Sequence, residues 1–230
     1  MKSSFKAVGF DLDGTLYPNG SFYIRLLPFV VKNLPLLLAF DKARAVIRSE
    51  QEQPGFLHGQ DFYEYQAGIT AKMLKKGDSA AAVKERIERL MYRGWEPHFS
   101  KVRLFRHVKE VLADFRAAGL KLALLSDFPP EAKLENMGLA GIWDCVLCSE
   151  SVGALKPSPA SFLEMAGRLG CSPGEVLYVG NSRRYDVEGA KRAGMKSALV
   201  TGLVSKPPPE GTDADFTFRD YRKLRSFVLS

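Results

Sequence analysis

The sequence predicts an α/β fold: a three-layer α/β/α core with a Rossmann-like parallel sheet, and an α-helical cap domain inserted into it. The first observation is an apolar segment over residues 6–12, which has the length and composition of a buried strand. The second is a helical pattern over roughly 21–93 that no convincing strand signal interrupts. The third is an alternation of helices and short apolar strands from residue 102 onward, typical of a parallel sheet covered on both faces.

The helical segment is expected to form a cap over residues 18–100, which leaves 1–17 and 101–230 as the core. Within the cap, the run from Ser79 to Met91 places apolar residues at helical spacing. Its most apolar stretch, Leu26 to Phe40, is interrupted by two prolines and a lysine. Fifteen such residues are too few for a membrane span, so we expect a helical hairpin, buried or facing the substrate, and no integral membrane segment.

The elements of the core follow from apolar runs and their stop signals. Helices are expected to end at Gly119 and Gly170, and Ser158-Pro159 is a typical helix start. The predicted strands are 121–125, 145–148, 176–179 and 197–200, and the predicted helices are 107–118, 158–169 and about 187–193.

Composition limits the classes of function. With 230 residues and 46% hydrophobic content, the chain can bury a substantial core. A formal charge of +7 favours anionic partners, but the basic residues are dispersed and match no nucleic-acid-binding motif, so we expect no nucleic acid partner. The three cysteines and the absence of a signal-peptide pattern predict a reducing, cytoplasmic location. Cys145 and Cys148 have CxxC spacing but lie in a predicted strand, so we interpret them as buried side chains.

Asp11 and Asp13 end the first predicted strand and are followed by Gly14, which allows a sharp turn. Side chains at i and i+2 of an extended segment point the same way, so the two carboxylates can share one site. The residues that follow do not continue as a calcium-binding EF-hand loop. Two close carboxylates can divide the work of a nucleophile and a proton carrier.

Other polar residues follow the later strands. Ser126 and Asp127 end one strand, Asn181 and Asp186 follow another, and Lys156 precedes a proline-initiated helix. Ligands of open parallel sheets bind beyond the carboxyl ends of the strands, so we expect these residues to meet at one edge.

Four segments in this order resemble the haloacid dehalogenase superfamily, specifically its phosphatase-like members with a helical C1-type cap. They are Asp11-x-Asp13-Gly14-Thr15, the strand ending in Ser126, Lys156-Pro157, and Gly180-Asn181-Ser182 with Asp186-x-x-Gly189-Ala190. The resemblance implies a phosphatase in which Asp11 attacks phosphorus and forms an aspartyl-phosphate, while Asp13 carries the protons.

The resemblance also implies the binding residues. Lys156 and Ser126 would hold phosphate oxygens, with the backbone amide of Asp127 as a further donor. Mg²⁺ would be bound by Asp11, the backbone carbonyl of Asp13, Asn181 and Asp186. The family usually has Asp in place of Asn181 and often Asn in place of Asp127. We therefore expect weaker Mg²⁺ binding, with Asp186 as the main remaining acidic ligand.

The substrate is expected to be a small phosphorylated metabolite. Dehalogenation is disfavoured because those enzymes characteristically lack a second aspartate at the position of Asp13. Sugar-phosphate mutase activity remains open, as does a catalytically weak binding protein, for which Asn181 is the main argument. Phosphonatase chemistry needs a cap lysine, and Lys32, Lys42, Lys72, Lys75 and Lys76 leave this possibility open. The sequence does not decide between a monomer and a dimer.

Overall fold

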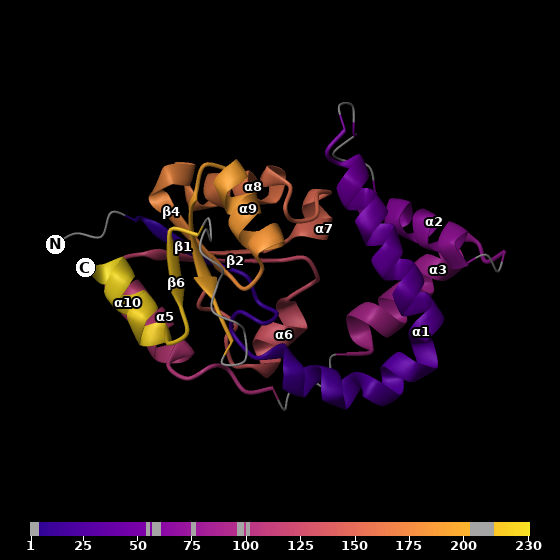
Figure 1. The fold of residues 1–230 in the computed structure, drawn as a ribbon, viewed down its shortest axis with the longest axis horizontal. Helices are drawn as coiled ribbons and strands as arrows, with labels where there is room; N and C mark the ends of the chain where they lie inside the picture. The colour runs from indigo at the N-terminus through magenta and orange to yellow at the C-terminus, as the bar shows by residue number, and fades with distance from the viewer. Residues whose placement is uncertain are drawn as a thin grey trace.

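The computed structural model describes residues 5–53, 56, 61–74, 77–95, 99, 102–202 and 214–230, with only the backbone of 21–25. A six-stranded sheet, parallel throughout, forms the centre of the core in the order β3-β2-β1-β4-β5-β6 (Figure 1). The strands are β1 (Ala7–Phe10), β2 (Lys121–Ser126), β3 (Cys145–Cys148), β4 (Val176–Gly180), β5 (Lys196–Val200) and β6 (Phe216–Phe218). The α/β prediction is confirmed, and β6 is a strand that the sequence reading missed.

Strand β1 lies in the middle because all four of its residues are buried, as a central parallel strand requires. Its last residue, Phe10, pairs with Leu124 of β2 and with Val179 of β4. The carboxyl ends of the three strands therefore lie at one edge of the sheet. The residues that follow β1 and β4 are brought together there.

Helices cover both faces of the sheet (Figure 1). Alternate strand residues face opposite sides, so Val8 and Phe10 pack with α5 and α10, whereas Ala7 and Ala123 pack with α8 and α9. The core helices are α5 (Val108–Ala117), α6 (Glu131–Asn136), α7 (Ser149–Val152), α8 (Pro159–Leu169), η2 (Pro173–Glu175), η3 (Arg183–Val187), α9 (Glu188–Arg192) and α10 (Tyr221–Leu229). Cys145 and Cys148 are buried and not disulfide-bonded, as the sequence analysis expected.

A group of helices, here called the helical module, stands beyond the carboxyl edge of the sheet (Figure 1). It consists of α1 (Asn19–Glu50), α2 (Phe62–Leu74), α3 (Ala80–Ile87) and η1 (Glu88–Arg93). The expected hairpin over 26–40 is wrong, because this stretch lies within the single helix α1. Its prolines, Pro28 and Pro35, are seven residues apart on the exposed face, where carbonyls that lose a hydrogen-bond partner can face water.

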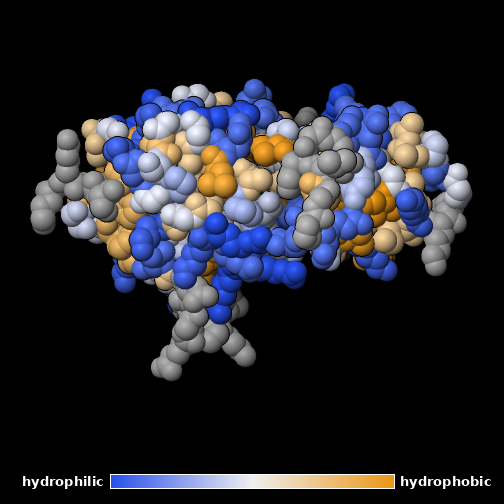
Figure 2. Space-filling model, turned by 90° about the horizontal axis from the view of Figure 1, so that it is seen from above, coloured by the Kyte–Doolittle hydropathy of each residue, from blue (hydrophilic) through white to orange (hydrophobic). Residues whose placement is uncertain are grey.

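The apolar stretch of α1 divides between two faces. Leu36 and Phe40 join the buried core of the module, whereas Leu27, Val31, Leu34 and Leu38 are exposed. Figure 2 shows one face of the molecule, which is mostly hydrophilic with hydrophobic residues in small groups. Among the described helices, none combines the length and apolar character needed to cross a membrane.

Candidate active site

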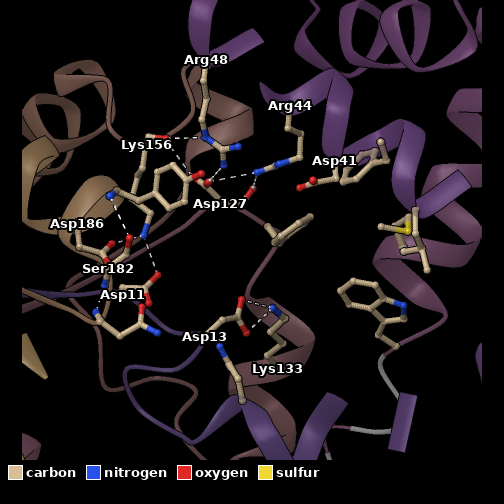
Figure 3. Close-up of a pocket in the computed structure, with 18 of the residues that line it drawn as sticks. Asp11, Asp13, Asp41, Arg44, Arg48, Asp127, Lys133, Lys156, Ser182 and Asp186 are labelled. Atoms are coloured by element: carbon tan, nitrogen blue, oxygen red, sulfur yellow. Dashed lines mark hydrogen bonds and ion pairs between the residues drawn. The ribbon is translucent and has the colours of Figure 1, made fainter. Parts of the chain in front are cut away.

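A cavity of about 540 Å³ lies where the helical module faces the carboxyl edge of the sheet (Figure 3). Both parts of the chain supply its walls. From the strand ends and the loops near them come Asp11, Asp13, Asp127, Lys156, Asn181 and Asp186. From α1 come Leu37, Phe40, Asp41, Arg44 and Arg48.

Asp11 follows β1 and is almost completely buried. One carboxylate oxygen accepts a 2.7 Å hydrogen bond from Lys156 Nζ, and the other accepts one of 2.7 Å from Thr15 Oγ1. Burial raises the pKa of Asp11 to about 7, with Asp186 and Asp13 adding to the effect and Lys156 opposing it. Asp11 is thus held in one orientation at the base of the cavity.

Lys156 connects two carboxylates. Its Nζ lies 2.7 Å from Asp11 Oδ1 and 2.7 Å from Asp186 Oδ1, and it also contacts the hydroxyl of Tyr178 at 3.3 Å. Burial alone would lower the pKa of this lysine, but attraction to Asp11 and Asp186 outweighs it and raises the pKa well above its ordinary value. Lys156 is therefore a fixed cation at the place where the sequence analysis expected one.

Asp186 and Asn181 belong to the loop after β4. The second oxygen of Asp186 accepts hydrogen bonds from the backbone amides of Asn181 (3.1 Å) and Ser182 (2.9 Å), which fixes the loop. Asn181 packs against Gly14, where an added Cβ would lie only 2.1 Å from its Nδ2. Gly14 also has a φ of +86°, which disfavours any side chain there. Glycine is thus required on both counts.

Asp13 also lines the cavity but is more exposed than Asp11. Its oxygens lie 2.8 and 2.6 Å from Lys133 Nζ, and it accepts a hydrogen bond from the hydroxyl of Tyr17. Lys133 comes from the short helix α6 and is itself buried. The carboxylate of Asp13 is thereby oriented by two side chains that the sequence analysis did not identify.

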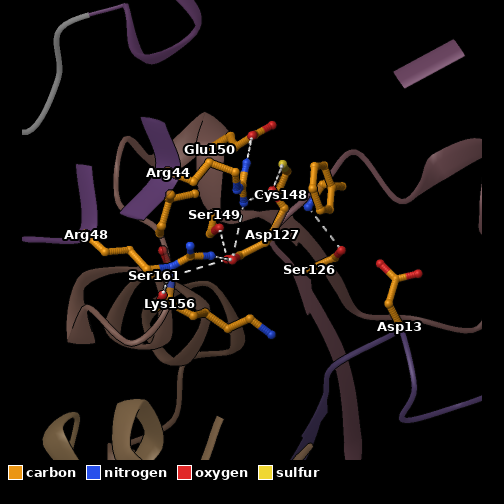
Figure 4. A network of polar contacts seen from close by, with 12 residues as sticks. Asp13, Arg44, Arg48, Ser126, Asp127, Cys148, Ser149, Glu150, Lys156 and Ser161 are labelled. Carbon is orange, nitrogen blue, oxygen red and sulfur yellow. Dashed lines mark hydrogen bonds and ion pairs between the residues drawn. The ribbon is translucent and has the colours of Figure 1, made fainter. Parts of the chain in front are cut away.

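The two predicted phosphate-binding residues at the end of β2, Ser126 and Asp127, differ from each other in their relation to the cavity (Figure 4). Ser126 is buried, does not line the cavity, and accepts a 3.2 Å hydrogen bond from the amide of Phe128. Asp127 lines the cavity, but its carboxylate pairs with Arg48 (2.8 Å) and Arg44 (3.3 Å) and accepts a hydrogen bond from Ser149 Oγ (2.5 Å). The side chain of Asp127 joins α1 to the core, which leaves only its backbone amide for the expected role.

Arg44 and Arg48 are the other residues that the sequence analysis missed. Arg44 is buried, pairs with Glu150, and lies 4.4 Å above the ring of Phe128. Arg48 donates to the carbonyl of Lys156 (2.9 Å) and lies 4.5 Å above the ring of Tyr185. The sequence did contain a signal for them. Both arginines lie on the face of α1 on which Phe40 and Ile47 are buried at helical spacing.

The site offers hard oxygen donors that suit Mg²⁺. Two buried carboxylates, Asp11 and Asp186, share a single lysine, and Asn181 lines the same cavity. Within the described ranges, no three Asp, Glu, His or Cys side chains form a complete metal cage. Mg²⁺ is commonly held by one or two carboxylates together with water and substrate phosphate, so these residues fit it.

Three of the five lysines considered for Schiff-base chemistry give it no support. Lys32, Lys42 and Lys72 are exposed and do not line the cavity. Lys75 and Lys76 lie outside the described residues.

A family model described as haloacid dehalogenase-like hydrolase matches residues 5–194 of the chain. Two curated relatives align along almost the whole chain. A phosphoglycolate phosphatase of Haemophilus influenzae is 26% identical over 99% of this chain and 100% of its own length. A glyceraldehyde 3-phosphate phosphatase of Methanopyrus kandleri is 28% identical over 97% of both chains.

Solved structures are similar along the same length. The crystal structure of a HAD phosphatase from Thermococcus onnurineus is 28% identical, with a TM-score of 0.64 over 97% of this chain and 98% of the other. A 2-haloacid dehalogenase from Pseudomonas syringae has a TM-score of 0.66 at 20% identity, covering 97% and 98% of the two chains, which shows a shared fold only.

Proposed function

The chain belongs to the haloacid dehalogenase-like hydrolases and is a phosphatase, and we propose that it hydrolyses monoesters of small phosphorylated metabolites with Mg²⁺ through an aspartyl-phosphate. The observation that carries the proposal is the contact between Asp11 and Lys156 at the base of the cavity. A buried carboxylate with a fixed cation beside it can approach a phosphate dianion that would otherwise repel it. The curated relatives are themselves named as phosphatases of small metabolites.

In the proposed reaction, an oxygen of Asp11 attacks phosphorus in line while the bond from phosphorus to the ester oxygen breaks. Asp13 gives a proton to the departing alcohol. It then accepts a proton from the water that attacks phosphorus and breaks the aspartyl-phosphate bond, so that inorganic phosphate leaves and both aspartates are restored. Lys156 holds phosphate oxygens in place throughout. Lys133 and Tyr17 keep the Asp13 carboxylate oriented for both transfers.

Mg²⁺ would be held by Asp11, Asn181, Asp186 and the backbone carbonyl of Asp13. When bound, it supplies positive charge that reduces the repulsion between the attacking carboxylate and the phosphate. The two carboxylates that share Lys156 leave the site short of positive charge, which favours such an ion.

The helical module acts in this proposal as a cap over residues 18–100, and we expect the enzyme to work as a cytoplasmic protein. Its free cysteines fit a reducing compartment. The module supplies one wall of the cavity, so it is the part of the chain that would select the leaving group.

The test is release of inorganic phosphate from p-nitrophenyl phosphate by the full chain, with Mg²⁺ and with EDTA. We expect activity only with Mg²⁺, and a loss of at least a thousandfold in Asp11→Asn, which keeps the shape of the side chain but removes the nucleophile. Asp114→Asn, an exposed carboxylate paired with Arg225, is the matched control and should keep full activity. Undiminished activity in Asp11→Asn would refute the assigned nucleophile, and a wild-type chain with no activity would favour a binding protein.

A further inference from the structure

The cations that line the cavity are already committed to carboxylates of the protein. Among the residues that the structure describes, four basic and five acidic side chains line it. Among the described residues, Lys156 pairs with Asp11 and Asp186, Lys133 pairs with Asp13, and Arg44 and Arg48 pair with Asp127. A second anionic group on a substrate would therefore have to displace one of these ion pairs.

Asp41 is the fifth carboxylate, and its situation differs. It lies on α1 one turn before Arg44, is exposed, and directs its carboxylate toward the interior of the cavity (Figure 3). In the part of the chain that the structure describes, no hydrogen bond or ion pair engages this carboxylate. The nearby guanidinium of Arg44 is directed instead to Glu150 and Asp127.

The surroundings of Asp41 are apolar and aromatic. The same wall of the cavity contains Leu37, Phe40, Met91, Trp95 and Phe128. The rings of Phe40 and Phe128 stack with their centroids 6.2 Å apart, and Phe128 lies 6.2 Å from Trp95. Aromatic faces attract cations, so a cation beside Asp41 can also be stabilised by this wall.

We propose that Asp41 binds a cationic group on the leaving alcohol, so that the substrate class is the phosphate monoester of an amino alcohol. This inference rests on the proposed phosphatase reaction and assigns its leaving group. The phosphate would lie at Asp11 and Lys156, and the ammonium would lie against Asp41 and the apolar wall. Among the described residues that line the cavity, a leaving group with a carboxylate would instead meet an excess of carboxylates and no uncommitted cation.

The experiment compares three substrates of similar size with the full chain and Mg²⁺: phosphoethanolamine, its neutral analogue propyl phosphate, and the anionic phosphoglycolate. We expect kcat/KM to be at least tenfold higher for phosphoethanolamine than for propyl phosphate, and lowest for phosphoglycolate. In Asp41→Asn, the ratio between phosphoethanolamine and propyl phosphate should fall at least tenfold. Asp41→Lys should place phosphoglycolate above phosphoethanolamine.

Glu85→Gln is the matched control, because Glu85 is an exposed carboxylate on the same module that does not line the cavity. It should leave the substrate ratio unchanged, which separates a local effect from one of net charge. A wild-type preference for phosphoglycolate, or a ratio that Asp41→Asn does not change, would overturn the inference while hydrolysis of propyl phosphate still supports the phosphatase. No hydrolysis of any of these esters or of p-nitrophenyl phosphate would overturn both.

Discussion

Lys133 shows how a single residue outside the recognised motifs can shape the site. Its ammonium lies within 2.8 Å of both oxygens of Asp13 and 5.1 Å from the ring centroid of Phe99. In the proposed reaction Asp13 first donates a proton to the leaving alcohol and then accepts one from water. Both transfers require its carboxylate to be held in a fixed orientation. Lys133 is therefore a positioning residue for the proton carrier.

Replacing Lys133 with methionine keeps much of the aliphatic volume but removes the cation that orients Asp13. We expect kcat on p-nitrophenyl phosphate to fall roughly 10- to 100-fold, which is less than the roughly 10²- to 10⁴-fold typical of general acid–base catalysis because Asp13 itself remains. Lys133→Arg should recover part of the loss. Steady-state kinetics with a thermal melt of each variant checks this. An unchanged kcat in a folded Lys133→Met protein would contradict the assigned role.

Asp127 gives the stability of the protein a pH dependence with a definite sign. Burial alone would raise the pKa of Asp127, but attraction to Arg44, Lys156 and Arg48 outweighs burial and lowers it to about 2. A depressed carboxyl pKa stabilises the fold above about pH 4, and this contribution disappears as pH falls toward 2. The shift corresponds to about 2 kcal/mol of unfolding free energy.

Asp127→Asn should therefore be less stable than the wild type at pH 6, and the difference should shrink by about 2 kcal/mol between pH 5 and pH 2. Urea unfolding at several pH values measures it. Asp114→Asn, whose ion pair is exposed, should differ from the wild type by less than about 1 kcal/mol throughout. A constant gap for Asp127→Asn at every pH would show that the ion pairs contribute nothing.

At the scale of elements, the C-terminal end of α1 is attached to the loop that carries Lys156. The side-chain amide of Gln51 donates to the carbonyl of Leu155 (2.7 Å) and accepts from the amide of Leu155 (3.1 Å). The Gln51 side chain thus bonds Leu155 in the way that a neighbouring strand would. Glu52 adds an exposed pair with Arg192. The buried bonds are the stronger constraint, because breaking them leaves the amide of Leu155 without a partner.

Gln51→Ala should cost about 1–3 kcal/mol of unfolding free energy because the buried amide of Leu155 loses its partner, while the Leu155 carbonyl keeps only its hydrogen bond from the amide of Ser158. Hydrogen exchange should become faster at the end of α1 and around residue 155. Glu52→Gln is the comparison, with an expected cost of less than about 1 kcal/mol since its pair is exposed. Equal costs for the two variants would show that the buried bonds are not the attachment.

Short elements explain most of what the sequence could not provide. Strand β6 has three residues and α6 has six, which is too short for a hydrophobic period to be recognised. Lys133, which lies on α6, was missed for that reason. Helix α1 was misread as a hairpin because two prolines imitate a break, although both fall on its exposed face.

At the scale of the whole molecule, the fold was predictable because its alternating pattern repeats along most of the chain. The superfamily, the phosphatase class and the α/β core are confirmed. The strand order and the contacts between α1 and the core were not predictable, since each depends on residues far apart in the sequence, such as Ala7 with Val176 in the sheet and Arg48 with Asp127 beside it. The cap boundaries, the catalytic roles and the metal ligands remain predictions.

Mg²⁺ binding should be visible in the stability of the whole chain. A ligand that binds only the folded state at 100 times its Kd adds about 2.7 kcal/mol to the unfolding free energy. Asn181→Asp supplies another charged oxygen, so we expect half-maximal activity and half of the thermal shift at lower Mg²⁺ concentrations than in the wild type. Titrations with Mg²⁺ in the absence of Ca²⁺ measure the two midpoints, one from the melting temperature and one from the rate of phosphate release. A variant that needs more Mg²⁺ would contradict the place of residue 181 among the ligands.

Arg48 connects α1 to three loops of the core. Its guanidinium contacts the peptide of Lys156, the carboxylate of Asp127 and the ring of Tyr185. Lys156 is the residue whose ammonium contacts Asp11. A displacement of this part of α1 would therefore have to break a hydrogen bond to the Lys156 peptide, which couples the position of α1 to the geometry at the base of the cavity.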